Sequence, residues 1–286
     1  MAQPPVIVGV EDAPGMAVVV NWAADEARRR DTRLHLVRAW LPQPFDTPDA
    51  AANPADRQAA ETLVAGLAEL AATRQPGLEV SSGIVETGPR EALESLSRTA
   101  GLLVLGRRGS GGFPGLLAGS TSQHLAASAA CPVVVVPAAP GPEASGGVAV
   151  GLRGKDAGEV LLTQAFEAAQ RLRAPLRVVH AWRNPLLLSR GHALPPVYEA
   201  GQIADQQTRL LAEILAGWRQ RYPDVPVETD TVRSGPAKRL VELSATQRLV
   251  VVGRHGNVAG LVGRLGSVSQ AVVHHAACPV EVVPMG

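Results

Sequence analysis

Short apolar stretches alternate along the chain with longer segments in which apolar residues recur at helical spacing. The short stretches are rich in valine, isoleucine and leucine, which is typical of buried parallel strands. In the first half of the chain, strands are predicted at residues 6–10, 34–39, 79–85, 102–105 and 133–136. Helices are predicted at residues 17–30 and 55–74, from Gly88-Pro89 onward, and after Gly119. The pattern therefore predicts strict alternation of strands and helices.

The same pattern occurs a second time. The stretch VIVGV, which contains Gly9, reappears as VAVGL around Gly151, 142 positions later. The stretch LHLVRAW ends at Trp40, and LRVVHAW ends at Trp182 with the same spacing of 142. The chain therefore contains an internal duplication.

The spacing between the two copies changes once. Gly106 matches Gly253 at a distance of 147 positions. Gly88 and Gly235, each followed by proline, are also 147 positions apart. The second copy therefore carries five additional residues between Trp182 and Gly235.

A segment rich in proline and glycine, residues 137–147, joins the two copies. We predict two related domains, residues 1–142 and 143–286, divided near Glu143. Each is long enough to bury its own core. Alternating strands and helices predict an α/β domain with a parallel sheet and helices on both faces. Ligands of such sheets bind beyond the carboxyl ends of the strands, where the strand order reverses.

Composition narrows the class of protein. The net charge is +1 and aromatic residues make up 3% of the chain, so neither charge nor base stacking favours a nucleic acid partner. No apolar run reaches the roughly 18 residues that a membrane span needs. The first residues, MAQPPVIVGVED, do not resemble a signal peptide. Cys131 and Cys278 occupy matching places and are expected to be buried thiols. We expect a cytoplasmic protein that binds neither nucleic acid nor membrane.

A glycine pattern follows the fourth predicted strand of each copy. In the first copy its residues are Gly106, Gly109, Gly119, Ser120, Ser122 and Gln123. In the second copy they are Gly253, Gly256, Gly266, Ser267, Ser269 and Gln270. Glycines allow a ligand to approach the backbone closely, and a helix N-terminus presents free N–H groups, so this layout suits a phosphate group. The pattern is neither a Walker A loop nor a G-x-G-x-x-G fingerprint.

A purely structural interpretation of the serines is available. Ser120 with Gln123, and Ser267 with Gln270, match the capping box S-x-x-Q. Capping explains the spacing of serine and glutamine. It does not explain the glycines that recur after a buried strand in both copies, so a ligand site is the favoured hypothesis and capping the alternative.

These pieces together resemble the universal stress protein family, in the tandem form of actinobacteria. The matching pieces of the first copy are VIVGVED, WAADEARRR, LHLVRAW, GRRGSGGFPGLLAGSTSQHL and ACPVVVVP. Those of the second copy are VAVGLRG, LRVVHAW and GRHGNVAGLVGRLGSVSQAVVHHAACPVEVVP. The resemblance covers essentially the whole chain, and its glycine pattern is that of the family's ATP-binding subgroup.

The resemblance implies a fold and a ligand. The fold is two Rossmann-like domains of the adenine nucleotide alpha hydrolase-like type. Each has a five-stranded parallel sheet of order 3-2-1-4-5 with helices on both faces. The ligand is ATP, with ADP or AMP as alternatives and Mg²⁺ accompanying ATP, in the crevice between the first and fourth strands.

The resemblance also implies the residues that bind the nucleotide. Those of the first domain are Gly9, Val10, Glu11, Ala39, Gly106, Arg108, Gly109, Gly119, Ser120, Thr121 and Ser122. Those of the second domain are Gly151, Leu152, Arg153, Ala181, Gly253, His255, Gly256, Gly266, Ser267, Val268 and Ser269. In both sets the glycines and serines after the fourth strand would hold the phosphates.

The two copies depart from the family pattern at the end of the first strand. Where the family usually has aspartate near the ribose, the first copy has Glu11 and the second has Arg153. Glutamate keeps the carboxylate, whereas arginine has no acceptor for ribose hydroxyls. We therefore expect weaker or altered nucleotide binding in the second domain.

No set of nucleophile, base and acid recurs in both copies, so no catalytic residue is predicted. The leading hypothesis is a stress-response protein that binds ATP as a sensor, with occupancy shifting loop 110–118 and so changing a surface for a regulatory partner. The alternatives are a slow ATPase or phosphoryl-transfer enzyme, and a scaffold whose nucleotide sites have decayed. The adjacent His274 and His275 are not expected to bind a metal, because adjacent helical residues point about 100° apart.

The last strand of each copy is short and apolar. As edge strands, residues 133–136 and 280–283 would invite pairing. In the resemblance this strand pairs across dimers, so we expect the two domains of one chain to pair through it, with a homodimer as a further assembly. The charged helix end DEARRR, residues 25–30, is expected to face solvent.

Overall fold

The computed structural model describes residues 3–40, 54–107, 118–139, 146–152, 158–181, 197–232, 235–255 and 265–285. In the first half these form β1 (Val6–Gly9), α1 (Met16–Arg29), β2 (Leu34–Ala39), α2 (Pro54–Arg74), β3 (Val80–Val85), α3 (Pro89–Leu96), β4 (Leu102–Gly106), α4 (Ser120–Ser128) and β5 (Val133–Val136). The predicted alternation is confirmed, with boundaries that differ from the sequence expectation by about one residue.

The second half repeats this order. Its elements are β6 (Val148–Leu152), α5 (Glu159–Leu172), β7 (Leu176–Ala181), α6 (Val197–Arg221), β8 (Val227–Val232), α7 (Pro236–Ser244), β9 (Leu249–His255), α8 (Ser267–His275) and β10 (Val280–Met285). Helix α6 has 25 residues and its counterpart α2 has 21, so α6 takes up four of the five inserted residues. The predicted division near Glu143 lies outside the described residues.

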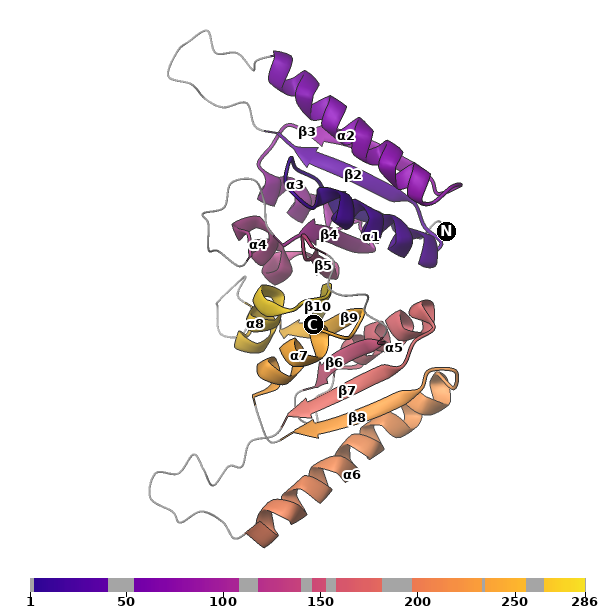
Figure 1. The fold of residues 1–286 in the computed structure, drawn as a ribbon, viewed down its shortest axis with the longest axis vertical. Coiled ribbons are helices and arrows are strands. Elements are labelled where there is room, and N and C mark those ends of the chain that lie inside the picture. The colour runs from indigo at the N-terminus through magenta and orange to yellow at the C-terminus, as the bar shows by residue number, and fades with distance from the viewer. Residues whose placement is uncertain are drawn as a thin grey trace, which may run out of the picture.

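All ten strands belong to one sheet, in the order β3-β2-β1-β4-β5-β10-β9-β6-β7-β8. Within each half the strands are parallel and their order is 3-2-1-4-5, as the resemblance implies. The halves meet where β5 pairs antiparallel with β10. Figure 1 shows the resulting elongated molecule, with β5 and β10 at its middle and α2 and α6 at its two ends.

The junction is the strand pair that the sequence predicts. Val280 pairs with Val135, Glu281 with Val134, and Val282 with Val133. Residues of β5 are at most 2% exposed, so this edge is fully covered within one chain. The pairing expected between residues 133–136 and 280–283 is therefore present.

The two faces of the sheet differ at the junction. On the face covered by α3, α4, α7 and α8, a single hydrophobic core runs through both halves and includes Leu125 and Val272. On the face covered by α1 and α5, each half has its own core. Trp22 of α1 packs against both of these cores and bridges them.

Two equivalent arginines tie the halves together beside the continuous core. The Arg107 Nη1 donates a hydrogen bond of 2.6 Å to the carbonyl of Ala276, where α8 ends. Arg254 donates in the same way to the carbonyl of Ala129, where α4 ends. Cations suit these positions, because the last carbonyls of a helix carry partial negative charge.

Helices α4 and α8 do not begin with a capping box. Their N-cap residues are Gly119 and Gly266, and neither cap is closed by a side chain. Ser120 and Ser267 are therefore the first helical residues, one position too late to act as caps. Gln123 donates from Nε2 to the carbonyl of Ala118 at 3.1 Å. The capping alternative is wrong, since the serines lie inside the helix.

The expectation that residues 25–30 face solvent is also wrong for three of them: Ala27 belongs to the core of the first half, and Glu26 and Arg30 are largely buried. The side chains of Glu26 and Arg30 are 7% and 15% exposed, and the Arg30 Nε donates to Glu26 Oε1 at 2.7 Å. From the second half, Arg171 approaches Glu26 to 3.3 Å, and Glu281 approaches Arg30 to 3.8 Å. These four residues form the inter-domain charge cluster. Docking of the second half buries side chains that a single domain would expose.

The charges in this cluster depend on one another. Burial favours the neutral form of Glu26, but the charges of Arg30 and Arg171 outweigh it, so the pKa of Glu26 lies below its ordinary value. Burial raises the pKa of Glu281 despite the opposing pull of Arg30 and Arg171. Glu26 is therefore the carboxylate whose ionisation contributes to stability.

We predict that Glu26→Gln lowers the free energy of unfolding at neutral pH by about 3 kcal/mol, because it leaves buried arginine charges unpaired. The pKa of Glu26 is lowered in the folded state, so its contribution is complete above the ordinary value of 4.5 and is lost as the pH falls. Urea unfolding over a pH series measures this. The exposed Glu69→Gln on α2 is the control. A loss that persists unchanged at acidic pH contradicts the prediction.

Candidate functional site

The switch point of each half lies between its first and fourth strands. In the first half β1 and β4 are adjacent and parallel, with Val8 paired to Val104. The chain leaves β1 for β2 on one side and reaches β4 on the other, so the strand order reverses here. Gly9 and Gly106 are the last residues of these two strands. The sequence-predicted glycines therefore lie where open α/β sheets bind ligands.

Helix α4 begins beside the end of β4. The Gly119 N–H donates to the carbonyl of Arg107 at 2.7 Å, which holds the start of the helix against the strand end. The first bond within the helix runs from the Gln123 N–H to the Gly119 carbonyl at 3.1 Å. The N–H groups of the preceding helical residues Ser120, Thr121 and Ser122 therefore form the donor-rich first turn, which attracts anions.

The second serine of each pattern has a buried side chain. The Ser122 Oγ donates to the carbonyl of Gly106 at 2.7 Å, and the Ser269 Oγ donates to the carbonyl of Gly253 at 2.8 Å. Both residues are buried, with exposed fractions of 6% and 5%. A hydroxyl has one proton to donate. These two serines therefore fix the first helical turn against the strand end.

The glycine that ends the first strand has a packing reason. A Cβ on Gly9 would lie 2.8 Å from Leu105 Cδ2 and 2.9 Å from Leu93 Cδ1. A Cβ on Gly151 would lie 2.8 Å from Leu240 Cδ1. Leucines of α3 and α7 thus press directly on the ends of β1 and β6. The absence of a side chain here serves the packing of a helix on the sheet.

The chain that follows β1 is bonded to the end of β2 in the first half. The Val10 N–H donates to the carbonyl of Val37 at 2.9 Å, and the Arg38 Nη1 donates to the carbonyl of Val10 at 3.3 Å. Sequence reasoning missed Arg38. Its position beside Ala39, at the end of the second strand, is the signal that was available.

The equivalent position in the second half is His180. Its Nε2 lies 2.9 Å from Gln207 Oε1 of α6, and the residue is 4% exposed. The first half thus has an arginine next to its crevice where the second half has a buried imidazole. Together with Glu11 and Arg153, this makes the two crevices chemically different.

The structure places only part of the predicted site. Glu11, Ala39, Leu152, Ala181, Gly266, Ser267 and Val268 lie at the strand ends and helix starts described above. Arg108, Gly109, Arg153 and Gly256, the side chain of His255 and positions 110–117 of the predicted moving loop lie outside the described residues.

Other predicted features can be placed as well. Cys131 and Cys278 are buried free thiols, as expected, and burial raises their pKa values to about 11 and about 12. Among the described residues, no group of three or more His, Cys, Asp or Glu is arranged to hold a metal ion. No described helix is both long and apolar enough to cross a membrane.

The fold and the duplicated switch-point site are those of a known class of proteins. The chain belongs to the universal stress protein family, whose model matches residues 4–137 and 147–284. Both halves are thus domains of this family, and the resemblance in the sequence is confirmed.

Relatives of the same tandem length are known. The chain is 36% identical over 290 residues to a universal stress protein of Mycobacterium tuberculosis, covering 97% of this chain and 96% of the relative. A second protein of that organism is 36% identical over 291 residues, with coverage of 97% and 95%. A universal stress protein from Archaeoglobus fulgidus covers 99% of both chains with a TM-score of 0.72 at 15% identity, which shows the shared fold.

We predict that Ser122→Ala destabilises the protein by about 1–3 kcal/mol, because it leaves the Gly106 carbonyl without its donor in a buried place. Ser120→Ala, two residues earlier and exposed, should change stability by no more than about 0.5 kcal/mol. Urea unfolding of both variants measures the difference. Equal effects of the two substitutions would show that the buried hydroxyl does not hold the helix.

Proposed function

We propose that each half binds an adenine nucleotide, with the phosphates at the first turn of α4 and of α8. One observation carries the proposal: in both halves a helix N-terminus is fixed against the end of the fourth strand, at the switch point of the sheet. The glycine pattern of the family's ATP-binding subgroup supports ATP over other anions. ADP and AMP fit the same adenosine crevice, and Mg²⁺ would enter with ATP.

The first half is the stronger candidate of the two. Glu11 provides a carboxylate acceptor at the end of β1, and Arg38 adds a cation next to Val10. The second half has Arg153 and the buried His180 at these positions. We therefore propose tighter binding in the first half.

The proposed activity is regulation through nucleotide occupancy in the cytoplasm, rather than catalysis. The chain has no Walker lysine, and no recurring pair of carboxylates to hold Mg²⁺ for phosphoryl transfer. Occupied and empty forms would present different surfaces to a regulatory protein, and a homodimer of the tandem chain is a further assembly. A slow ATPase and a scaffold with decayed sites are the alternatives.

We predict that the protein purified under native conditions carries ATP, ADP or AMP, which mass spectrometry of the intact complex detects as a defined mass increase. Dialysed protein should then bind ATP in calorimetry with one tighter and one weaker site. If neither measurement finds nucleotide, the scaffold alternative is correct.

We further predict that Ser120→Asp abolishes the tighter site without loss of stability. A carboxylate in the first turn of a helix stabilises it, yet repels a phosphate at the same place. Ser120→Asn is the neutral control and should retain binding, and Ser267→Asp should remove only the weaker site. Full binding by both aspartate variants would rule out phosphate contacts at these helices.

The same variants test the enzymatic alternative. Phosphate release is followed in a single turnover with the protein in excess over ATP. The regulatory proposal predicts no release above the Ser120→Asp background. A burst that is present in the Ser120→Asn control and lost in Ser120→Asp would favour the ATPase.

A further inference from the structure

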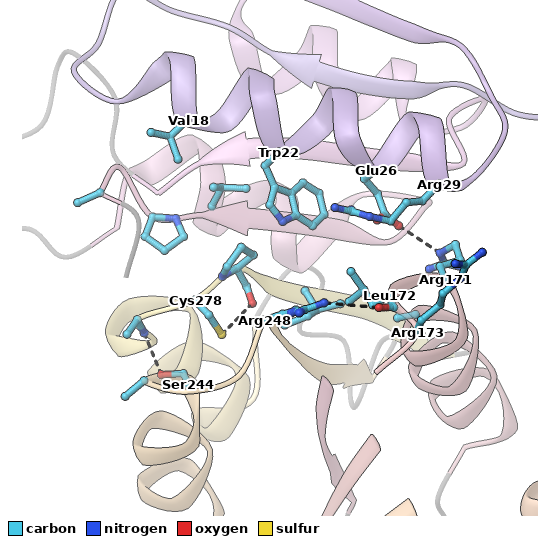
Figure 2. Close-up of a pocket in the computed structure, with 18 residues that line it drawn as sticks. Val18, Trp22, Glu26, Arg29, Arg171, Leu172, Arg173, Ser244, Arg248 and Cys278 are labelled. Carbon is cyan, nitrogen blue, oxygen red and sulfur yellow. Dashed lines mark hydrogen bonds and ion pairs between the residues drawn. The ribbon is translucent and has the colours of Figure 1, made fainter. Parts of the chain in front are cut away.

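A cavity of about 510 Å³ lies between the two halves, on the face of the sheet where their cores are separate. Its volume falls within the range of about 300–1,000 Å³ that is typical of small-molecule sites. Figure 2 shows Val18, Trp22, Glu26 and Arg29 of α1 on one side of it. The opposite side is formed by the end of α5 and by residues near Arg248.

The lining of the cavity includes no residue of α4 or α8, the helices that begin the proposed nucleotide sites. Its second-half wall includes Arg248, Leu249 and Pro279, which lie at the amino ends of β9 and β10, opposite the carboxyl ends where nucleotide would bind. Its first-half wall comes from α1 and from Val136 and Pro137 at the carboxyl end of β5, so in the first half the separation is by face of the sheet. Helix α4, which begins the first nucleotide site, lies with the continuous core on the other face.

One part of the lining is apolar. Trp22 presents its indole to the cavity while packing against both cores, and Val18, Val136 and Leu172 extend this surface. An indole offers a large flat contact area for an aromatic or aliphatic body.

The other part of the lining is positively charged. Among the described residues that line the cavity, Arg29, Arg171, Arg173 and Arg248 are cationic and Glu26 is the only anion. Glu26 already pairs with Arg29 at 3.0 Å, with Arg171 at 3.3 Å and, outside the lining, with Arg30 at 2.7 Å, so one carboxylate serves three guanidinium groups. The cavity therefore has a net positive lining.

Arg171 is largely buried and makes ion pairs with Glu26 at 3.3 Å and with Glu167 at 3.6 Å, yet its hydrogen bonding is incomplete. Its side chain is 16% exposed, and within the described chain its Nε and Nη2 have no hydrogen-bond acceptor. The contact with Glu26 is an ion pair without hydrogen-bond alignment. Burial lowers the pKa of Arg171, and the charge of Arg30 adds to this. Buried N–H donors without an acceptor are stabilised strongly by an anionic ligand, and a guanidinium can bind a carboxylate-like group in bidentate fashion.

We propose that this inter-domain cavity is a binding site for a small organic anion, in which Arg171 binds a carboxylate or sulfonate and Trp22 contacts an apolar body. Because the lining comes from both halves, such a ligand would bind only the docked tandem chain. The site is independent of the proposed nucleotide sites.

The test uses the full chain with naphthalene-1-sulfonate as probe and naphthalene-1-methanol as its neutral counterpart. Calorimetry should find the sulfonate bound at least tenfold more tightly than the alcohol. Binding should quench the fluorescence of Trp22, and Trp22→Phe should remove that quench. Equal affinity for the two probes, or no binding of the sulfonate, overturns the proposal.

Two arginine variants locate the anion. Arg171→Met should weaken sulfonate binding at least tenfold and leave the alcohol unchanged. Arg173→Asn is a second variant that should fold normally, because residue 173 has a φ of 48° that asparagine tolerates, and it should weaken the sulfonate several-fold. Unchanged sulfonate affinity in both variants overturns the assignment.

The nucleotide sites must be excluded, since a nucleotide is itself an aromatic anion. Sulfonate affinity should be the same in the double variant Ser120→Asp, Ser267→Asp, and in the presence of saturating ATP. Competition by ATP, or loss of sulfonate binding in the double variant, would place the probe in the nucleotide crevices and overturn the proposal of a separate site.

Discussion

The antiparallel pairing of β5 with β10 is the interaction on which the rest of the molecule depends. Each half ends in an apolar strand that would otherwise expose a row of backbone N–H and C=O groups and its valine side chains. The pairing provides hydrogen-bond partners for these backbone groups and covers the valine side chains. It joins two parallel sheets into one sheet of ten strands. It also sets the distance between α1 and α5, and so decides where the halves touch and where a space remains.

The two faces of this junction are stabilised by different interactions. On one face the cores merge, and burial of residues such as Leu125 and Val272 supplies the hydrophobic stabilisation. On the other face the halves meet through charged side chains, whose removal from water is costly. The continuous core therefore holds the halves together and allows the opposite face to keep a charged, partly open interface.

Local patterns in the sequence were enough to predict the alternation of elements, the duplication and the pairing of the last strands. Their causes are short-range: apolar runs form strands, and a bare edge needs a partner. The capping box failed locally, because each helix begins one residue earlier than that motif requires. The other failures involve distant contacts. The burial of Glu26 depends on Arg171 and on Glu281, which lie in the other half. The hydrogen bond of Ser122 to Gly106 also had no local signal, although its spacing of 16 residues is repeated at Ser269.

Arg107 and Arg254, which occupy equivalent positions in the two halves, each form a hydrogen bond to the other half. Through its carbonyl, Arg107 holds the first residue before α4, and through its guanidinium it holds the end of α8 in the other half. Arg254 reaches the end of α4 in return. Any coupling of ligand binding that passes through these bonds would be reciprocal, so that each half would change the affinity of the other by the same factor. Because one chain carries both halves, such a coupling would not depend on protein concentration.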